Sequence, residues 1–256
     1  MFSPLKLVKR HNAEKVYSNQ SVVEYYSKLQ DLQPCEELLF SKHLKDSVSV
    51  LDIGVGGGRT TPYLSEYVNR YVGIDFSDGM IKAAKIRFPL HDLRVCKAEN
   101  LSCFADCEFD SVVFSFNGID YITTDSDRTK CLSEIYRVLK KGGVFIFSSH
   151  NARYSIFLPC LSGVALHKSI WRIVLSAYKS FRISLRLATS GAWASQAGYY
   201  LDPVHGGLLT YSSTPLLMRQ QLDRAGFTLV EYVSGCYPRT DKVCFTPWWY
   251  YACKKQ

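Results

Sequence analysis

Short apolar runs and amphipathic stretches alternate along most of the chain. The apolar runs are rich in Val, Ile, Leu, Phe and Tyr, which is typical of buried strands. The stretches between them repeat apolar residues at intervals of three and four, which predicts helices. We expect strands at 48–53, 71–76, 93–98, 110–116 and 144–149, and helices at 60–68, 78–87 and 128–141. Strands and helices in this order form a parallel sheet that helices cover on both faces.

The alternation differs at the N-terminus and in the middle of the chain. Residues 13–44 carry a helical pattern without strands, and residues 152–206 interrupt the alternation. It resumes with a helix at 214–225 and two strands, at 228–233 and around 248–253, which are close enough in sequence to pair antiparallel. The sequence therefore predicts a doubly wound α/β fold with a seven-stranded, mostly parallel sheet and an inserted helical cap.

This pattern divides the chain into three parts. We expect an N-terminal helical lid over 1–44, an α/β core formed by 45–151 and 207–256, and a basic and aromatic substrate cap over 152–206. A chain of 256 residues is long enough for one large domain that carries such an insertion.

Composition narrows the class of protein only broadly. A hydrophobic share of 47% with 21% charged residues excludes a disordered or fibrous protein. The net charge of +8 favours acidic partners without selecting one. None of the nine cysteines forms a CxxC pair, so we expect reduced thiols and no metal site. Because the sequence has no signal-peptide core and no apolar run long enough for a transmembrane segment, we expect a cytoplasmic protein.

A glycine-rich turn follows the first expected strand, with the sequence Asp-Ile-Gly-Val-Gly-Gly-Gly-Arg from Asp52 to Arg59. A dinucleotide-binding turn needs a third glycine where this chain has Arg59, so that fingerprint fails and a nicotinamide enzyme is disfavoured. Instead, an acid stands two residues before the first glycine, Gly54, and Gly56 completes the tight turn. A glycine turn of this kind lets a ligand approach the backbone closely.

This segment resembles motif I of class I S-adenosylmethionine-dependent methyltransferases. The resemblance extends from Val48 to His150 and is strongest to relatives of the ubiquinone-biosynthesis methyltransferases. It implies a Rossmann-like methyltransferase core, S-adenosylmethionine as the cofactor, and Asp52, Gly54 and Gly56 at the amino-acid end of its pocket. There an acidic residue would favour the cofactor's ammonium group.

The resemblance also implies cofactor contacts at the ends of the following strands. Asp75 ends the second strand, where a carboxylate accepts hydrogen bonds from both ribose hydroxyls. An alternative role for Asp75 as a helix cap is disfavoured, because Ser77 or Asp78 is better placed for that. The other implied cofactor residues are Phe76 and Met80 beside the adenine, Ala98, Glu99 and Asn100 after the third strand, and Ser115, Phe116 and Asn117 after the fourth.

His150 is the candidate base for the methyl acceptor. It directly follows the fifth strand, and histidine can take a proton near neutral pH. The alternative is a histidine that bonds locally and steadies the turn. Tyr17 and Tyr25 resemble the aromatic residues with which related enzymes close a lid over the cofactor, although plain helix packing explains them equally well. Further candidates for acceptor contacts are Asn151, Tyr121, His205 and Tyr211.

The insertion contains a predicted basic amphipathic helix. Between residues 152 and 201 there are six Lys and Arg and no Asp or Glu. Apolar residues recur at helical spacing between 167 and 187, and cations recur on another face. Three interpretations stay open: the solvated face of a substrate-capping lid, a docking site for an acidic or carrier-bound substrate, and weak contact with an anionic membrane surface.

The function that the sequence favours is methyl transfer to an oxygen or nitrogen of a small-molecule acceptor. An RNA methyltransferase, of tRNA for example, is one alternative, and the net charge permits it. A nucleic-acid partner is nevertheless not expected, because the fourth strand ends in SFNG rather than the NPPY-type motif of enzymes that methylate base amino groups. A non-catalytic methyltransferase-like partner protein is another alternative, against which the intact glycine turn and Asp75 argue.

Overall fold

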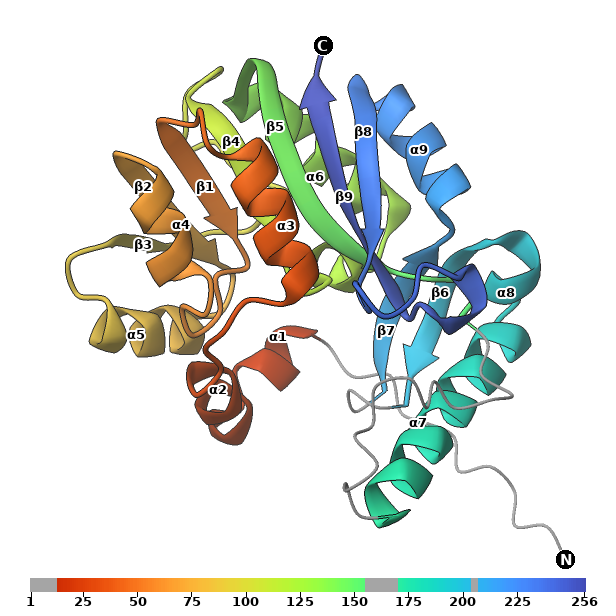
Figure 1. Ribbon diagram of the computed structural model, residues 1–256. Helices are drawn as coiled ribbons and strands as arrows, with labels where there is room; N and C mark the ends of the chain where they lie inside the picture. The colour runs from red at the N-terminus through yellow and green to blue at the C-terminus, as the bar shows by residue number, and fades with distance from the viewer. Residues whose placement is uncertain (1–12, 155–169, 204–206) are drawn as a thin grey trace, which may run out of the picture.

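The computed structural model describes residues 13–154, 170–203 and 207–256. These residues build one sheet with helices on both faces (Figure 1). The strands are β1 (Ser49–Ile53), β2 (Arg70–Asp75), β3 (Asp92–Val95), β4 (Phe109–Phe114), β5 (Leu139–His150), β6 (Ala197–Asp202), β7 (Leu208–Ser213), β8 (Phe227–Ser234) and β9 (Trp248–Lys255). The helices are α1 (Ala13–Tyr17), α2 (Gln20–Ser27), α3 (Pro34–His43), α4 (Thr61–Tyr67), α5 (Asp78–Arg87), α6 (Asp125–Val138), α7 (Ile170–Thr189), α8 (Ala192–Ser195) and α9 (Pro215–Arg224), with 3-10 turns η1 (Gly118–Tyr121) and η3 (Val243–Phe245).

All seven expected strands are present, in the order β3-β2-β1-β4-β5, with β9 and β8 continuing from β5. The first five run parallel, and β9 pairs antiparallel with both β5 and β8, as predicted for the last two strands. The predicted α/β fold with its mostly parallel sheet is therefore confirmed.

The sheet has nine strands rather than seven, because β6 and β7 form an additional antiparallel hairpin. This hairpin joins the end of β5 through the pair His150 and Ser212. The sequence pattern predicts no strands at these positions. Because β6 lies within residues 152–206, that part of the predicted cap belongs to the sheet.

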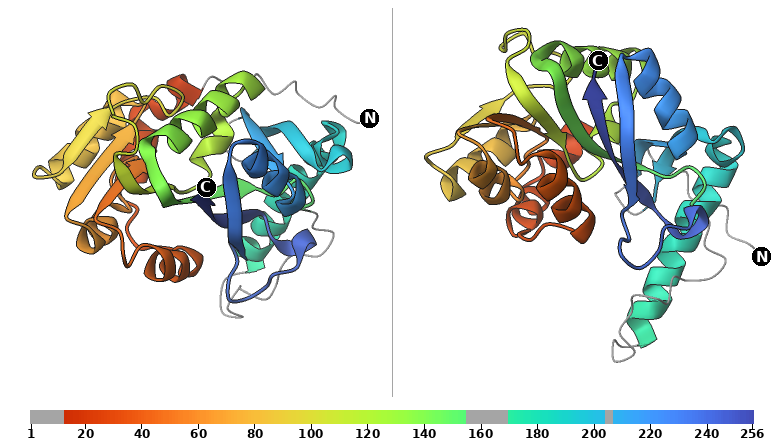
Figure 2. Two further views of the ribbon diagram at one scale, coloured as in Figure 1. Left: turned by 90° about the horizontal axis from the view of Figure 1, so that it is seen from above. Right: turned by 45° about the horizontal axis from the view of Figure 1, so that its top comes forward.

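Adjacent residues of a strand face opposite helical layers, which is why the parallel strands are apolar throughout. Val50 of β1 packs in a cluster with α3, α4 and α5, whereas its neighbour Leu51 packs in a cluster with α6 and α9. Figure 2 shows these helices on either side of the sheet. The two helical layers do not extend over the carboxyl ends of the parallel strands. Instead, the short helices α1 and α2 lie at these ends.

The three N-terminal helices lie in two different parts of the fold. Residues of α1 and α2 lie at the strand ends, where the sequence predicts a lid. By contrast, α3 packs into the core, with Cys35, Leu39 and Phe40 fully buried. Pro34 occupies the first turn of α3, where a missing N–H costs nothing. The predicted lid over 1–44 therefore includes a helix that belongs to the core layer.

Glu36 and Arg59 form an ion pair inside the protein. Two guanidinium nitrogens of Arg59 donate to the Glu36 carboxylate at 2.7 and 2.6 Å. The hydroxyl of Tyr250 and the backbone N–H of Gln33 donate to the same carboxylate, each at 2.7 Å. Because Glu36 lies on α3, Arg59 ends the glycine turn and Tyr250 lies on β9, this pair joins three distant parts of the chain.

We expect Glu36→Gln to lower the free energy of unfolding by about 3–5 kcal/mol, because Arg59 stays buried without its counter-charge. Chemical denaturation measures this change. Removing both charges in Glu36→Gln/Arg59→Met should recover part of the loss, and a double variant no more stable than the single one would contradict the pairing. As a control, Lys82→Gln breaks an exposed pair with Asp78 and should cost less than about 0.5 kcal/mol.

Candidate functional site

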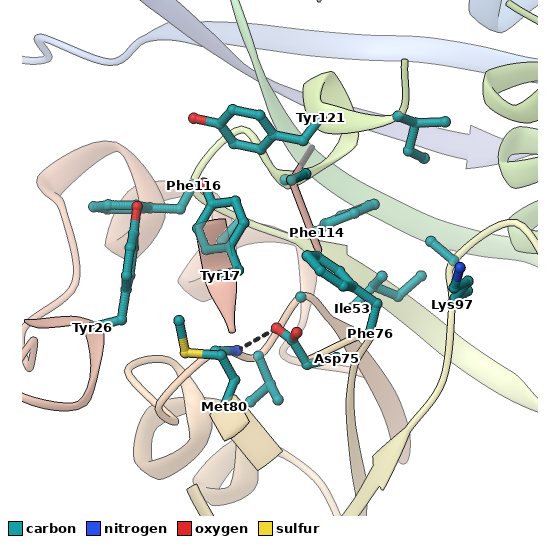
Figure 3. Close-up of a pocket in the computed structure, with 18 of the residues that line it drawn as sticks. Tyr17, Tyr26, Ile53, Asp75, Phe76, Met80, Lys97, Phe114, Phe116 and Tyr121 are labelled. Carbon is teal, nitrogen blue, oxygen red and sulfur yellow. Dashed lines mark hydrogen bonds between the residues drawn. The ribbon is translucent and has the colours of Figure 1, made fainter. Parts of the chain in front are cut away.

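A cavity of about 290 Å³ opens at the carboxyl ends of β1, β2 and β4. The glycine turn, the ends of these strands, the loop after β3, and α1 and α2 line it (Figure 3). The strand order reverses between β1 and β4, and ligands of open α/β sheets bind at such a reversal. The cavity is therefore at the position where this architecture places a ligand.

The glycine turn presents bare backbone to the cavity. Gly56 has a left-handed backbone, with φ of 55°, which an L side chain rarely adopts. At Gly57 the constraint is space: a Cβ there would lie 2.6 Å from Cα of Ser27. Glycine at this position lets the end of α2 lie directly against the turn. Gly54 and Gly56 both line the cavity.

Asp75 lies at the floor of the cavity, at the end of β2. One carboxylate oxygen accepts the N–H of Gly56 at 3.0 Å, and the other accepts the N–H of Ser77 at 2.8 Å. Burial raises the pKa of Asp75 to about 6, and the two backbone N–H groups oppose that rise. Ser77, not Asp75, caps α5. The carboxylate is thus held in one orientation, toward the cavity (Figure 3).

Asp52 has a different position from the expected one, because it does not line the cavity. Its Oδ2 accepts hydrogen bonds from the hydroxyls of Thr60 at 2.6 Å and Tyr71 at 2.8 Å. Burial raises the pKa of Asp52 to about 6. Its side chain alternates with that of Leu51 and so points into the layer of α3 to α5. Asp52 therefore links the start of α4 to β2 through hydrogen bonds. These bonds stabilise the glycine turn on the side away from the cavity.

Most of the other cofactor residues expected after β2 and β3 line the cavity. Those that line it are Phe76, Met80, Ala98 and Glu99. Asn100 does not, because its side chain accepts the N–H of Ser102 at 3.3 Å and shapes the loop.

The chain turns sharply where β4 ends. Phe116 and Asn117 are consecutive left-handed residues, with φ of 57° and 58°. Such strain in residues other than glycine clusters at functional sites. Ser115 and Phe116 line the cavity, and the buried hydroxyl of Ser115 has no partner among the described residues. Asn117 does not line the cavity: its backbone N–H donates to the Ser148 hydroxyl at 2.7 Å, and its side-chain amide nitrogen lies 3.4 Å from His150 Nε2.

Aromatic rings from three elements cover the cavity. The ring of Tyr17 contacts those of Tyr26, Phe76 and Tyr121 at centroid distances of 5.7, 5.9 and 5.5 Å (Figure 3). Tyr25, by contrast, is 62% exposed and does not line the cavity. Successive residues of a helix point about 100° apart, so only one of the two neighbouring tyrosines of α2 can face inward. Tyr26 takes the position that was expected for Tyr25.

His150 is paired with a buried carboxylate that sequence reasoning missed. Its Nδ1 lies 2.8 Å from Oδ2 of Asp120, which also accepts the His150 backbone N–H at 2.6 Å. The Ser149 hydroxyl donates to the other oxygen of Asp120 at 2.7 Å. Since a carboxylate only accepts, Nδ1 carries the proton and Nε2 is left as an acceptor. Nε2 faces the side-chain amide of Asn117 at 3.4 Å.

Asp120 lies on η1, in the stretch SFNGIDYI that begins as β4 ends. It is fully buried, and a guanidinium nitrogen of Arg128 lies 3.7 Å from it. Asp120 is the one acidic residue in that stretch, and this is the sequence feature that could have identified it as a candidate site residue. The next residue, Tyr121, lines the cavity, and its ring contacts that of His150 at 6.4 Å. The Asp120–His150 pair is therefore separated from the cavity by the ring of Tyr121. It lies at the side of the cavity where the β6–β7 hairpin joins β5.

Two residues predicted to contact the acceptor, Asn151 and Tyr211, do not line the cavity. The Asn151 amide donates to the backbone carbonyls of Val243 in η3 and Thr246 after it, at 2.6 and 2.7 Å, and its oxygen accepts the N–H of Arg153. Its polar atoms are thus used to hold β5 to the C-terminal loop. Tyr211 packs in the core with Arg128 stacked 3.7 Å from its ring centre. His205 lies outside the described residues.

Comparison with known proteins supports the resemblance inferred from the motifs. Residues 51–147 match the family model described as a methyltransferase domain. The ubiquinone/menaquinone biosynthesis C-methyltransferase of Desulfotalea psychrophila is 37% identical over 98 residues, which cover 37% of this chain and 38% of that protein. The phosphatidylethanolamine N-methyltransferase of Cereibacter sphaeroides is 34% identical over 110 residues, 41% of this chain and 51% of that protein.

The fold extends beyond the matched segment. The 1,6-didemethyltoxoflavin-N1-methyltransferase of Burkholderia thailandensis, solved with S-adenosylhomocysteine, aligns with a TM-score of 0.61 and 16% identity over 100% of this chain and 93% of that one. The chain spans about half the length of the curated relatives it matches. The sequence likeness thus centres on the cofactor half, and the fold likeness includes the rest.

Stability should depend on pH through Asp52. Its folded-state pKa is raised from about 4 to about 6, so the folded state binds a proton more tightly than the unfolded chain. The resulting stabilisation is present below pH 4 and is lost as the pH rises to 6. Asp52→Asn cannot ionise, so it should gain on the order of 2 kcal/mol relative to the wild type between pH 4 and pH 7.

Denaturation at a series of pH values measures this difference. Asp78→Asn replaces an exposed carboxylate on α5 and serves as the matched control, with no expected change in the profile between pH 4 and pH 7. A difference between Asp52→Asn and wild type that stays constant with pH would contradict the assignment.

Proposed function

We propose that this chain, whose residues 51–147 form a class I S-adenosylmethionine-dependent methyltransferase domain, transfers a methyl group from S-adenosylmethionine to an oxygen or nitrogen of a small molecule. The observation that carries the proposal is the Asp75 carboxylate, held beside the bare backbone of Gly56 at the floor of the cavity. A carboxylate at this position suits the ribose of a nucleoside. Arg59 in place of the third glycine disfavours a diphosphate beside that ribose.

The residues of the cavity fit the parts of this cofactor. Asp75 would accept the ribose hydroxyls, Phe76 and Met80 would flank the adenine, and the glycine turn would receive the amino-acid tail. The unpartnered Ser115 hydroxyl offers a further hydrogen bond. When bound, the cofactor supplies an activated methyl group on a cationic sulfur. Tyr17, over the cavity, would exclude water and favour that cation through its ring face.

Calorimetry with S-adenosylhomocysteine tests the cofactor assignment. The wild type should bind it and should not bind NAD. Asp75→Asn should weaken binding about 100-fold, because it removes charge-assisted hydrogen bonds to the ribose. Asp78→Asn, three residues along the chain and exposed, is the matched control and should bind like the wild type. Tight binding of NAD, or unchanged affinity in Asp75→Asn, would exclude this function.

The acceptor side of the site is assigned to the Asp120–His150 pair. An oxygen or nitrogen that attacks a methyl group must lose a proton, and the Asp120 contact leaves His150 Nε2 as the ring nitrogen without a proton. Asp120 would hold the ring in this tautomer. The Asn117 amide nitrogen, 3.4 Å from Nε2, would give way when the acceptor's proton is transferred to that nitrogen. Tyr121, between His150 and the cavity, would position the acceptor next to the methyl group.

Replacing His150 should separate chemistry from cofactor binding. An acceptor is first identified by incubating the chain with methyl-labelled S-adenosylmethionine and a metabolite extract. With that acceptor, His150→Gln should lower kcat by roughly 10²- to 10⁴-fold, because the base is lost, while affinity for S-adenosylhomocysteine is unchanged. Asp120→Asn should lower kcat more than it raises KM, since Asp120 acts through the ring. Full turnover in His150→Gln would remove histidine from the mechanism.

Methylation of RNA is the alternative within the same chemistry. It would use the same cavity, and the feature in its favour is the net charge of +8. Binding of RNA with a steep dependence on salt would support it. A non-catalytic partner protein would have no use for the Asp75 and Ser115 groups that face the cavity.

A further inference from the structure

Helix α7 carries a row of exposed apolar side chains. Val174, Tyr178, Phe181 and Leu185 follow one another at intervals of three and four, so they share one side of the helix. Their exposed fractions are 50%, 56%, 51% and 40%. Figures 1 and 2 show α7 reaching beyond the sheet rather than lying on it. A continuous apolar strip on an outer surface marks a site of interaction.

The opposite side of α7 packs against the protein. Leu187 is buried in a small cluster with Tyr154, and Ile183 packs on the same cluster. The hydroxyl of Ser180 lies 3.0 Å from that of Tyr154, and the two form a hydrogen bond. These contacts lie roughly half a turn around the helix from the exposed row. The row therefore faces away from the fold, and the described residues leave it uncovered.

Cations flank the exposed row. Lys179, Arg182 and Arg186 lie between it and the side that packs on the protein, as their positions at 3.6 residues per turn require. The Arg182 guanidinium lies 5.7 Å from the ring centre of Tyr178, at the edge of the row. No Asp or Glu occurs anywhere between residues 152 and 201 to neutralise these charges locally. Aromatic and aliphatic residues on one face with Lys and Arg beside them are typical of helices that lie in a membrane interface.

We propose that α7 docks this protein onto an anionic membrane surface, with the row of Val174, Tyr178, Phe181 and Leu185 inserted at the headgroup boundary and the three cations on lipid phosphates. The contact is peripheral, since within the described ranges every helix is too short or too polar to cross a bilayer. The row extends over about 16 Å along the helix, which suits a flat surface better than a pocket.

Charge distinguishes this occupant from a second copy of the chain. Two copies that met through the row would bring Lys179, Arg182 and Arg186 of one against the same residues of the other, which is unfavourable. Lipid phosphates remove this conflict, and each cation near an anionic surface strengthens binding by a factor of about five. The proposal does not depend on methyl transfer.

Co-sedimentation of the full chain with phosphatidylcholine vesicles, with and without phosphatidylglycerol, tests the proposal. The chain should sediment with the anionic vesicles and only weakly with the neutral ones, and added salt should weaken binding. Val174→Ser/Phe181→Ser should weaken partitioning by at least about tenfold, because two apolar side chains are lost from the boundary. Lys179→Gln/Arg182→Gln should weaken it by on the order of 20-fold.

Matched controls keep a folding defect apart from a binding defect. Ile86→Ser/Leu90→Ser removes two apolar residues that are even more exposed but lie on and after α5, and it should partition like the wild type. All variants should keep wild-type affinity for S-adenosylhomocysteine. The proposal is overturned if anionic vesicles do not bind the chain or if the α7 variants bind equally well. A dimer in ultracentrifugation that Val174→Ser/Phe181→Ser dissociates would assign the row to a second copy instead.

Discussion

The buried ion pair of Glu36 and Arg59 is the interaction on which the assembly of the cofactor side depends. Arg59 bonds the Glu36 carboxylate twice, donates to the backbone carbonyl of Asp31 at 3.2 Å, and lies over the ring of Phe116 at 4.4 Å. One side chain thus fixes α3, the segment before it, the end of the glycine turn and the strained loop after β4. A buried charge is tolerable only when it is fully paired, so these elements must come together in one arrangement. A third glycine at this position would provide none of these contacts.

The elements that the sequence predicted well are those whose pattern is local. Parallel strands buried on both faces are apolar throughout, and a glycine turn after such a strand indicates that a helix begins next. Asp75 could be predicted as a site residue because it ends a strand, and strand ends meet at one edge. The hairpin of β6 and β7 was missed because its pairing with the end of β5 at His150 and Ser212 is a long-range contact. Nothing in its own alternation indicates that partner.

Some polar residues that stand at strand ends do not line the cavity. Asp52 and Asn151 both stand at strand ends, yet their polar atoms bond hydroxyls or backbone carbonyls of the protein itself. The choice between Tyr25 and Tyr26 depends on the rotation of one short helix about its axis, and Asp120 was recognisable only once its carboxylate lay against His150. Such assignments depend on packing between elements, which periodicity in one element does not determine.

The distribution of charge along the chain favours a lipid surface over a nucleic acid as the acidic partner. Residues 152–201 hold six of the 31 Lys and Arg and none of the 23 Asp and Glu, so most of the net charge of +8 resides in the insertion. The excess charge is therefore not a general property of the α/β core. A nucleic-acid backbone would engage cations alone and would leave Val174 and Leu185 exposed to water, whereas a lipid surface accommodates both. Because α7 leads through α8 into β6, whose Tyr200 contacts His150 at a ring distance of 6.4 Å, the proposed membrane-contacting helix and the proposed base are connected through one short stretch of chain.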